Sequence, residues 1–269
     1  MLIQSKVAGV MMLLTAGCAA TAENPSFPVT VADAQTDLQR MRGEPKAPAR
    51  PIVILNGFGD PGAGGAYVGG ELRRELRDPQ IVCVSFLFCR SFDDCRRKVI
   101  EAVDQKWRSD DPAQTVEVDV IGLSMGGLVG RYCAAESTID PRRLQVHRLF
   151  TVSSPHQGAT RAERLPRLLQ MQIDMRPGSD FIRGLERAER DCNCAIYPYV
   201  RLEDEIVGEQ YASPPGKQAW WVSKLPMQPA HIGAATDPRI LADIIRRLRD
   251  ETPLTTEPAA PLPTVSFVQ

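Results

Sequence analysis

Residues 116–131, VEVDVIGLSMGGLVGR, constrain the fold of this chain more than any other stretch. The apolar residues before the first glycine predict a buried strand, and the residues from Met125 onward predict a helix with one apolar face. Ser124 lies between them, and Gly122 and Gly126 lie two residues to either side of it. A sharp strand-to-helix crossing favours glycine at those places, because Cβ atoms would obstruct it. The stretch therefore predicts a serine held on a tight turn.

The chain between residues 51 and 250 alternates apolar strands with helices. Such alternation predicts parallel βαβ units, and a parallel sheet is covered by helices on both faces. We therefore expect an α/β fold with a mostly parallel, doubly wound sheet. The expected strands are 51–59 (which runs into a glycine-rich loop), 80–88, 115–122, 146–155 and 195–204, and the expected helices are 66–76, 93–107, 125–137 and 238–250.

Several motifs, taken in chain order, resemble those of the α/β-hydrolases of the bacterial lipase and esterase type. VDVIGLSMGGLVGR is similar to their nucleophile elbow, with Leu123 where a His is often found, and VILNGFGDP is similar to the segment before their oxyanion hole, with Asn56 where a His usually stands. FTVSSPHQGAT, DMRPGSDFIRGL, RLEDEIVGEQYA and PAHIGAATDPRIL resemble further segments of the same enzymes. The matches run from about Pro51 to Arg249. The resemblance implies the α/β-hydrolase fold over 51–250, with a short cap at about 161–195.

The catalytic roles follow from chain order, which in this fold is nucleophile, acid, base. Ser124 is the expected nucleophile. The chain contains three histidines, and only His231 lies downstream of a plausible acid, in a loop before the last helix. His147 opens a predicted strand, and the resemblance implies a structural or cap-orienting role for His156. His231 is therefore the expected base.

Three consecutive carboxylates, Glu203, Asp204 and Glu205, follow the strand 195–204 and are candidates for the acid. The family places its Asp two residues before an aliphatic pair, which favours Asp204, and Glu203 and Glu205 remain as alternatives. The resemblance also implies an oxyanion hole formed by the backbone N–H groups of Phe58 and Met125.

These residues predict a carboxylic ester hydrolase that works through an acyl-enzyme on a small-molecule or lipid ester. An acyltransferase or thioesterase on the same triad, or a non-catalytic envelope protein that only binds, are the alternatives. No cofactor is expected, because the GFGDPGAGG loop lacks the lysine and the order of a phosphate-binding loop. No His lies near a Cys at zinc-site spacing, so no metal is expected either. A formal net charge of -1 disfavours a nucleic-acid partner.

The first 18 residues have the pattern of an export signal, with Lys6 followed by a short apolar run. Ala16-Gly17-Cys18 resembles a bacterial lipobox, in which Cys18 would be lipid-modified, and a plain secretory signal is the alternative. We expect an exported protein of the bacterial cell envelope, with a tether over 19–50 and an irregular proline-rich tail over 251–269. No run of 18 apolar residues is present, so membrane contact is expected through the lipid anchor only. The oligomeric state stays open.

Six further cysteines are present, and an even number in an exported chain predicts structural disulfides. Their pairing is open, because six cysteines allow 15 combinations. They are Cys83, Cys89, Cys95, Cys133, Cys192 and Cys194.

Overall fold

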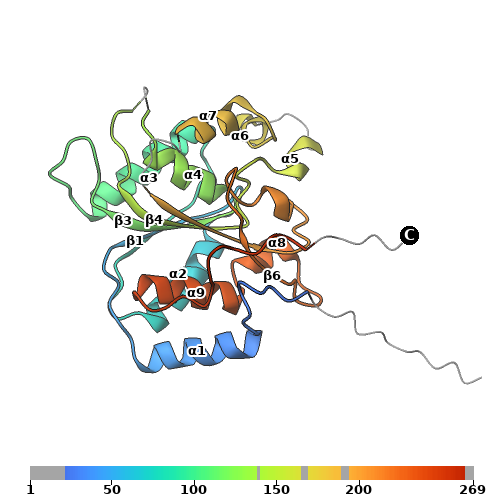
Figure 1. The fold of residues 1–269 in the computed structure, drawn as a ribbon. Coiled ribbons are helices and arrows are strands. Elements are labelled where there is room, and N and C mark those ends of the chain that lie inside the picture. The colour runs from blue at the N-terminus through green and yellow to red at the C-terminus, as the bar shows by residue number, and fades with distance from the viewer. Residues whose placement is uncertain (1–21, 138–139, 165–168, 189–193, 264–269) are drawn as a thin grey trace, which may run out of the picture.

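The computed structural model describes residues 22–137, 140–164, 169–188 and 194–263. Its centre is one sheet of six parallel strands in the order β2-β1-β3-β4-β5-β6 (Figure 1). The predicted doubly wound parallel sheet is confirmed. The strands are β1 Ile52–Leu55, β2 Ile81–Val84, β3 Val118–Leu123, β4 Val146–Val152, β5 Ala195–Arg201 and β6 Trp220–Val222.

Helices cover both faces of this sheet. The helices α3 and α4 pack on one face, and α2 and α9 pack on the other. The helices are α1 Val31–Gly43, α2 Ala63–Glu75, α3 Phe92–Lys106, α4 Met125–Ala134, α5 Thr160–Arg164, α6 Gln170–Asp174, α7 Asp180–Ala188, α8 Ala230–Ala234 and α9 Pro238–Leu248, with a 3-10 turn at Glu209–Tyr211. In the part of the chain that is described, no helix is long and apolar enough to cross a membrane.

The strand β1 shows how the sequence builds two cores. Successive side chains of a strand point to opposite faces. Val53 and Leu55 accordingly belong to the core under α3 and α4, whereas Ile52 and Ile54 belong to the core under α2 and α9. All four are fully buried, as expected for a central strand of a parallel sheet.

Residues 19–50, expected as a tether, include the 13-residue helix α1. Ala34, Leu38 and Met41 lie three or four residues apart and form its buried face. This face packs with α2 and α9 in the second core, and Figure 1 shows α1 beneath those helices, on the side away from the sheet. Residues 31–43 are therefore part of the folded domain.

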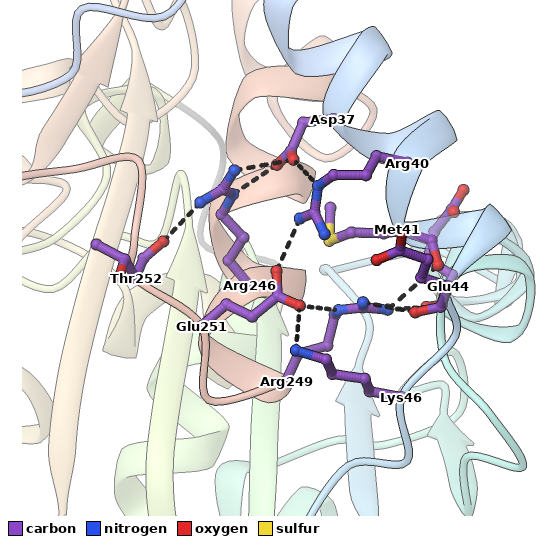
Figure 2. Close-up of polar contacts among 10 residues, drawn as sticks. Asp37, Arg40, Met41, Glu44, Lys46, Arg246, Arg249, Glu251 and Thr252 are labelled. Carbon is purple, nitrogen blue, oxygen red and sulfur yellow. Dashed lines mark hydrogen bonds and ion pairs between the residues drawn. The ribbon is translucent and has the colours of Figure 1, made fainter.

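Ion pairs join α1 to the end of α9 and the chain beyond it (Figure 2). The Asp37 carboxylate accepts hydrogen bonds from Arg40 and Arg246, at 2.9 Å each. The Glu251 carboxylate contacts Arg40 at 2.7 Å, Lys46 at 2.8 Å and Arg249 at 3.0 Å. Several partly buried charges that share partners hold α1 more firmly than isolated surface pairs would.

The strand β2 ends at Val84, earlier than the apolar run 80–88 suggests. The Asn56 side chain donates to the Val84 carbonyl at 2.9 Å, and the Ser85 hydroxyl donates to the Asp60 carbonyl at 2.7 Å. These bonds turn the chain into a loop. Its apolar tip, Leu87 and Phe88, is exposed to solvent.

The structure does not support the expected disulfides for four of the cysteines. Cys83, Cys89, Cys95 and Cys133 have free thiols. The Cys95 thiol interacts with that of Cys89 and lies 3.8 Å from the Met171 sulfur, and burial raises its pKa. Cys192 lies outside the described residues, as does Cys18.

Candidate active site

Ser124 lies on the turn between β3 and α4, with a φ of 50°. This left-handed conformation is uncommon for a residue other than glycine and occurs where the surrounding structure enforces it. The crossing is tight, because a Cβ atom on Gly122 would lie 2.5 Å from the Gly127 Cα and one on Gly126 would lie 2.1 Å from the Leu55 carbonyl oxygen. The two glycines thus have the role expected from the sequence.

The structure brings Ser124, His231 and Asp204 together from three separate segments, and His231 lies in the first turn of the short helix α8 rather than in the expected loop. The His231 Nε2 lies 3.0 Å from the Ser124 Oγ, and the His231 Nδ1 lies 3.0 Å from both carboxylate oxygens of Asp204. These distances place a base in hydrogen-bond contact with a hydroxyl, and a carboxylate behind the base. The arrangement can move a proton from the serine to the histidine.

The Asp204 side chain is fully buried yet charged. Burial alone would raise the pKa of its carboxyl, but the hydrogen bond with His231 and the backbone N–H groups of Ile206 and Val207 outweigh burial and lower it. Those two N–H groups donate to Oδ1 at 3.0 and 2.9 Å. The carboxylate is therefore ionised and oriented towards the imidazole near neutral pH.

The two neighbouring carboxylates have other partners. Glu203 is exposed and pairs with Lys224 at 3.1 Å. The Glu205 Oε2 accepts the backbone N–H groups of Ala230 and His231, at 3.1 and 3.3 Å. Of the three candidates for the acid, only Asp204 contacts the imidazole among the described hydrogen bonds. Glu205 instead holds the backbone that carries the base, a role that the sequence reasoning did not foresee.

The loop after β1 lies next to the nucleophile. A Cβ atom on Gly57 would be 3.4 Å from the Ser124 Cβ. Within the described chain, neither the Phe58 nor the Met125 backbone N–H donates a hydrogen bond to another residue. The Met125 N–H belongs to the first residue of α4, where the helix dipole favours negative charge. Both expected donors thus lack a described partner, and both belong to residues next to Gly57 or Ser124 in the chain.

Buried polar side chains position these loops. The Asn56 amide donates to Val84 and accepts the Gly65 N–H at 2.7 Å, which joins β1, β2 and α2 below the glycine-rich loop. The fully buried Arg201 donates to Asp237 at 2.7 Å and to the Gln228 side chain at 3.0 Å, so it connects both ends of the segment that carries the base. An isolated arginine or asparagine in a sequence carries no periodic signal, and neither role was predicted.

The other histidines lie away from Ser124. His156 is fully buried, with its Nε2 2.8 Å from the Thr151 hydroxyl and its Nδ1 3.2 Å from the Arg131 guanidinium. Burial, together with the charges of Arg131 and Lys217, lowers its pKa well below the usual value, so the ring is neutral. His147 is exposed at the amino end of β4.

The cap region between β4 and β5 contains α5, α6 and α7 in its described parts. Phe181 of α7 stacks on Phe92 of α3, with ring centroids 3.9 Å apart, and meets Tyr132 of α4 edge-on at 5.5 Å. The cap therefore packs on the same helical layer as α3 and α4, as Figure 1 shows.

Solved structures with this fold include lipases. The mature lipase BlEst2 of Bacillus licheniformis aligns over 79% of this chain and 94% of its own, with 12% identity and a TM-score of 0.54. The product of the gene lin2722 of Listeria innocua aligns over 76% of this chain and 95% of its own, with 13% identity and a TM-score of 0.51. These similarities confirm the predicted α/β-hydrolase fold. No curated protein matches the chain significantly in sequence.

A family profile described as palmitoyl protein thioesterase matches residues 51–212. The match extends from β1 through the elbow to the candidate acid, and it covers more than half of the chain. Membership of a thioesterase family supports a hydrolase of acyl ester bonds. The chain belongs to the palmitoyl protein thioesterase family.

Proposed function

We propose that this protein hydrolyses acyl esters and thioesters with Ser124 as nucleophile, His231 as general base and Asp204 as the acid. One observation carries the proposal, the unbroken hydrogen-bond chain from the Asp204 carboxylate through the imidazole to the Ser124 hydroxyl, with 3.0 Å at each step. Three residues from segments far apart in the chain meet in the arrangement that this chemistry requires.

The reaction has two halves. The Ser124 Oγ attacks the acyl carbonyl carbon as the His231 Nε2 takes its proton, and Asp204 stabilises the resulting imidazolium. The tetrahedral intermediate collapses, the bond to the alcohol or thiol breaks, and His231 returns the proton to the leaving group. Water then attacks the acyl-enzyme with His231 as base again, which releases the carboxylic acid and the free serine.

The oxyanion of each intermediate would be stabilised by the backbone N–H groups of Phe58 and Met125. Removal of one such donor typically costs about 3–4 kcal/mol. Main-chain donors survive every side-chain substitution. They depend instead on the loop conformation that Asn56 and the glycines support.

The family description favours a long-chain acyl thioester as the natural substrate class. A thiol with a pKa of about 8.5 also leaves as a thiolate more readily than an alcohol leaves as an alkoxide. Water as acceptor distinguishes this proposal from the acyltransferase alternative. An assay that finds most of the acyl group on an added alcohol or amine, and little free acid, would favour transfer.

A fluorophosphonate probe tests the proposal directly, because it labels only an activated serine. We expect one label on the full chain, at Ser124, together with hydrolysis of palmitoyl thioesters and p-nitrophenyl esters. Ser124→Ala should lose both. Ser153→Ala is a matched control, because the Ser153 hydroxyl is buried, has no described partner and follows the neighbouring strand β4. Unlabelled, folded protein would exclude the catalytic proposal and favour a protein that only binds.

We further propose that the chain is exported to the bacterial cell envelope and acylated at Cys18. The support is the sequence pattern that ends in Ala16-Gly17-Cys18. Metabolic labelling with a fatty-acid analogue should mark the parent chain and Cys83→Ser, which alters an exposed thiol. It should not mark Cys18→Ser, and equal labelling of Cys18→Ser would contradict acylation at this residue.

A further inference from the structure

The exposed large apolar side chains of the described chain share one edge of the molecule. In a parallel sheet all strands end at the same edge, and here Ser124 lies at that edge, at the end of β3. Phe58 follows β1, and Leu87 and Phe88 follow β2. We call the whole set the apolar rim: Phe58, Tyr67, Leu87, Phe88, Leu169, Met227 and Ile232.

The rim surrounds the candidate active site from several loops. Met227 is fully exposed and Ile232 is 71% exposed, and they lie four residues before and one residue after His231. Phe88, at 86%, is the most exposed aromatic side chain that is described. Tyr67 lies in the first half of α2, which begins just after the β1 loop, and Leu169 precedes α6 in the cap. Large apolar side chains gathered on one face of a protein mark an interaction surface.

The start of the described chain lies close to the apolar rim, and this bears on what the rim binds. The Asn24 side chain donates to the Trp221 carbonyl in β6 at 2.7 Å. Ala22 and Glu23 line a cavity of about 330 Å³ together with Leu225 and Pro226, the residues directly before Met227. Ala22, the first described residue, therefore lies beside the loop that carries Met227.

Distance then limits where a lipid anchor can be. Four peptide units separate Cys18 from Ala22, and an extended chain spans at most about 3.6 Å per residue, or about 14 Å in all. An acyl chain on Cys18 would therefore be attached within that distance of Ala22, which lines the same cavity as Leu225 and Pro226. So short a connection cannot let the opposite edge of the domain face the membrane.

We propose that the apolar rim docks on the phospholipid bilayer that holds the acylated N-terminus, so that the catalytic edge faces the lipid. Phe88, Met227 and Ile232 would insert among the acyl chains, and Ser124 would open towards the membrane surface. Substrates would be acyl groups presented at that surface. This inference rests on the proposed function and on acylation of Cys18.

The test uses the full acylated chain in phosphatidylcholine vesicles with brominated acyl chains, which quench nearby indoles. Phe88→Trp places an indole on the rim, and His147→Trp places one at the amino end of β4, on the opposite edge. We expect brominated lipid to quench the added emission of Phe88→Trp at least twofold and to leave that of His147→Trp unchanged. Equal quenching of both, or none at Phe88→Trp, would overturn the proposal. If a second copy of the chain covered the rim, the Phe88→Trp indole would not be quenched.

A second measurement separates docking from chemistry. In Phe88→Ser/Met227→Ser, turnover of a palmitoyl thioester embedded in the vesicles should fall about tenfold or more, since each buried apolar side chain contributes appreciably to partitioning. Turnover of a soluble short-chain ester should stay within about twofold of the parent. Unchanged turnover of the embedded substrate would contradict docking. If the parent protein did not hydrolyse the soluble ester at all, that result would instead contradict the proposed function.

Discussion

Glu205 allows a sharp test of the candidate active site, because its carboxylate holds the backbone of the base without touching the imidazole. The Glu205 Oε2 accepts two N–H groups, from Ala230 at 3.1 Å and from His231 at 3.3 Å. Both N–H groups lie in the first turn of the short helix α8, which has no other side-chain cap. Loss of this clamp should let the imidazole move away from the Ser124 hydroxyl.

The expected magnitude follows from those two bonds. A net contribution of about 0.5–1 kcal/mol for each bond, the lower part of the usual range, applies here, because the Glu205 side chain is exposed and solvent weakens its charge. Glu205→Ala should therefore cost about 1–2 kcal/mol, and kcat should fall roughly 5- to 30-fold. KM should change little, because the clamp does not face the bound substrate. Glu205→Gln keeps an acceptor oxygen and should restore most of the activity.

Steady-state turnover of a soluble p-nitrophenyl ester, together with the rate of fluorophosphonate labelling, measures the loss of activity in Glu205→Ala and its recovery in Glu205→Gln. Glu203→Ala is the matched control, since its carboxylate pairs only with Lys224 among the described contacts, and it should behave like the parent. If Glu205 were the acid, Glu205→Gln would lose activity by orders of magnitude. Such a loss, or a Glu205→Ala variant with full activity, would refute the assignment of Asp204 as acid and Glu205 as clamp.

Three further predictions concern other parts of the molecule. Asp204→Asn should lower kcat by about 10³- to 10⁴-fold, because the amide favours the wrong imidazole tautomer, and thermal melting should show a folded protein. Gly126→Ala should lower the urea-unfolding free energy by about 2–3 kcal/mol, because its Cβ would lie 2.1 Å from a backbone oxygen, whereas Gly70→Ala on α2 meets open space and should not destabilise. Burial would raise the pKa of Glu251, but hydrogen bonds with Lys46, Arg40 and Arg249 outweigh it and lower the pKa to about 2. Ionised Glu251 therefore adds stability above about pH 4.5 that is lost as the pH falls towards 2, so the Tm difference between the parent and Glu251→Gln should shrink over that range, and a constant difference would contradict this pairing.

The elements that the sequence predicted well are those whose signal is local. The strands β1, β3, β4 and β5 and the helices α2, α3, α4 and α9 were expected within a few residues, because their apolar periodicity reports burial directly. The serine and its glycines could be located from their local motif. The histidine could be located because the fold places nucleophile, acid and base in a fixed order along the chain. The acid could be narrowed to three adjacent residues, of which the spacing found in the resembling family favoured Asp204, and Asp204 is the residue that contacts His231 in the structure.

The missed features depend on partners far along the chain. The helix α1 has a weak apolar face of three residues, Ala34, Leu38 and Met41, and its surroundings in the sequence suggested a tether. The strand β6 is only three residues long and carries no period that could distinguish it. Leu87 and Phe88 extend an apolar run, but bonds from Asn56 and Ser85 end the strand before them. Long-range hydrogen bonds of this kind are not visible in a single sequence.

The docking of α1 on α9 also has a consequence for the order in which the chain folds. The contacts between Asp37 and Arg246 join residues 209 positions apart, and the Ser26 carbonyl accepts the N–H of Thr256, which lies still farther along the chain. Contacts of such long sequence separation form late, because closing a long loop costs entropy before the contact can stabilise it. The packing of α1 is thus completed only after α9 has been synthesised. Until then its apolar face has α2 but not α9 to pack against, and we expect a chain truncated before α9 to leave Leu38 and Met41 partly exposed and to aggregate.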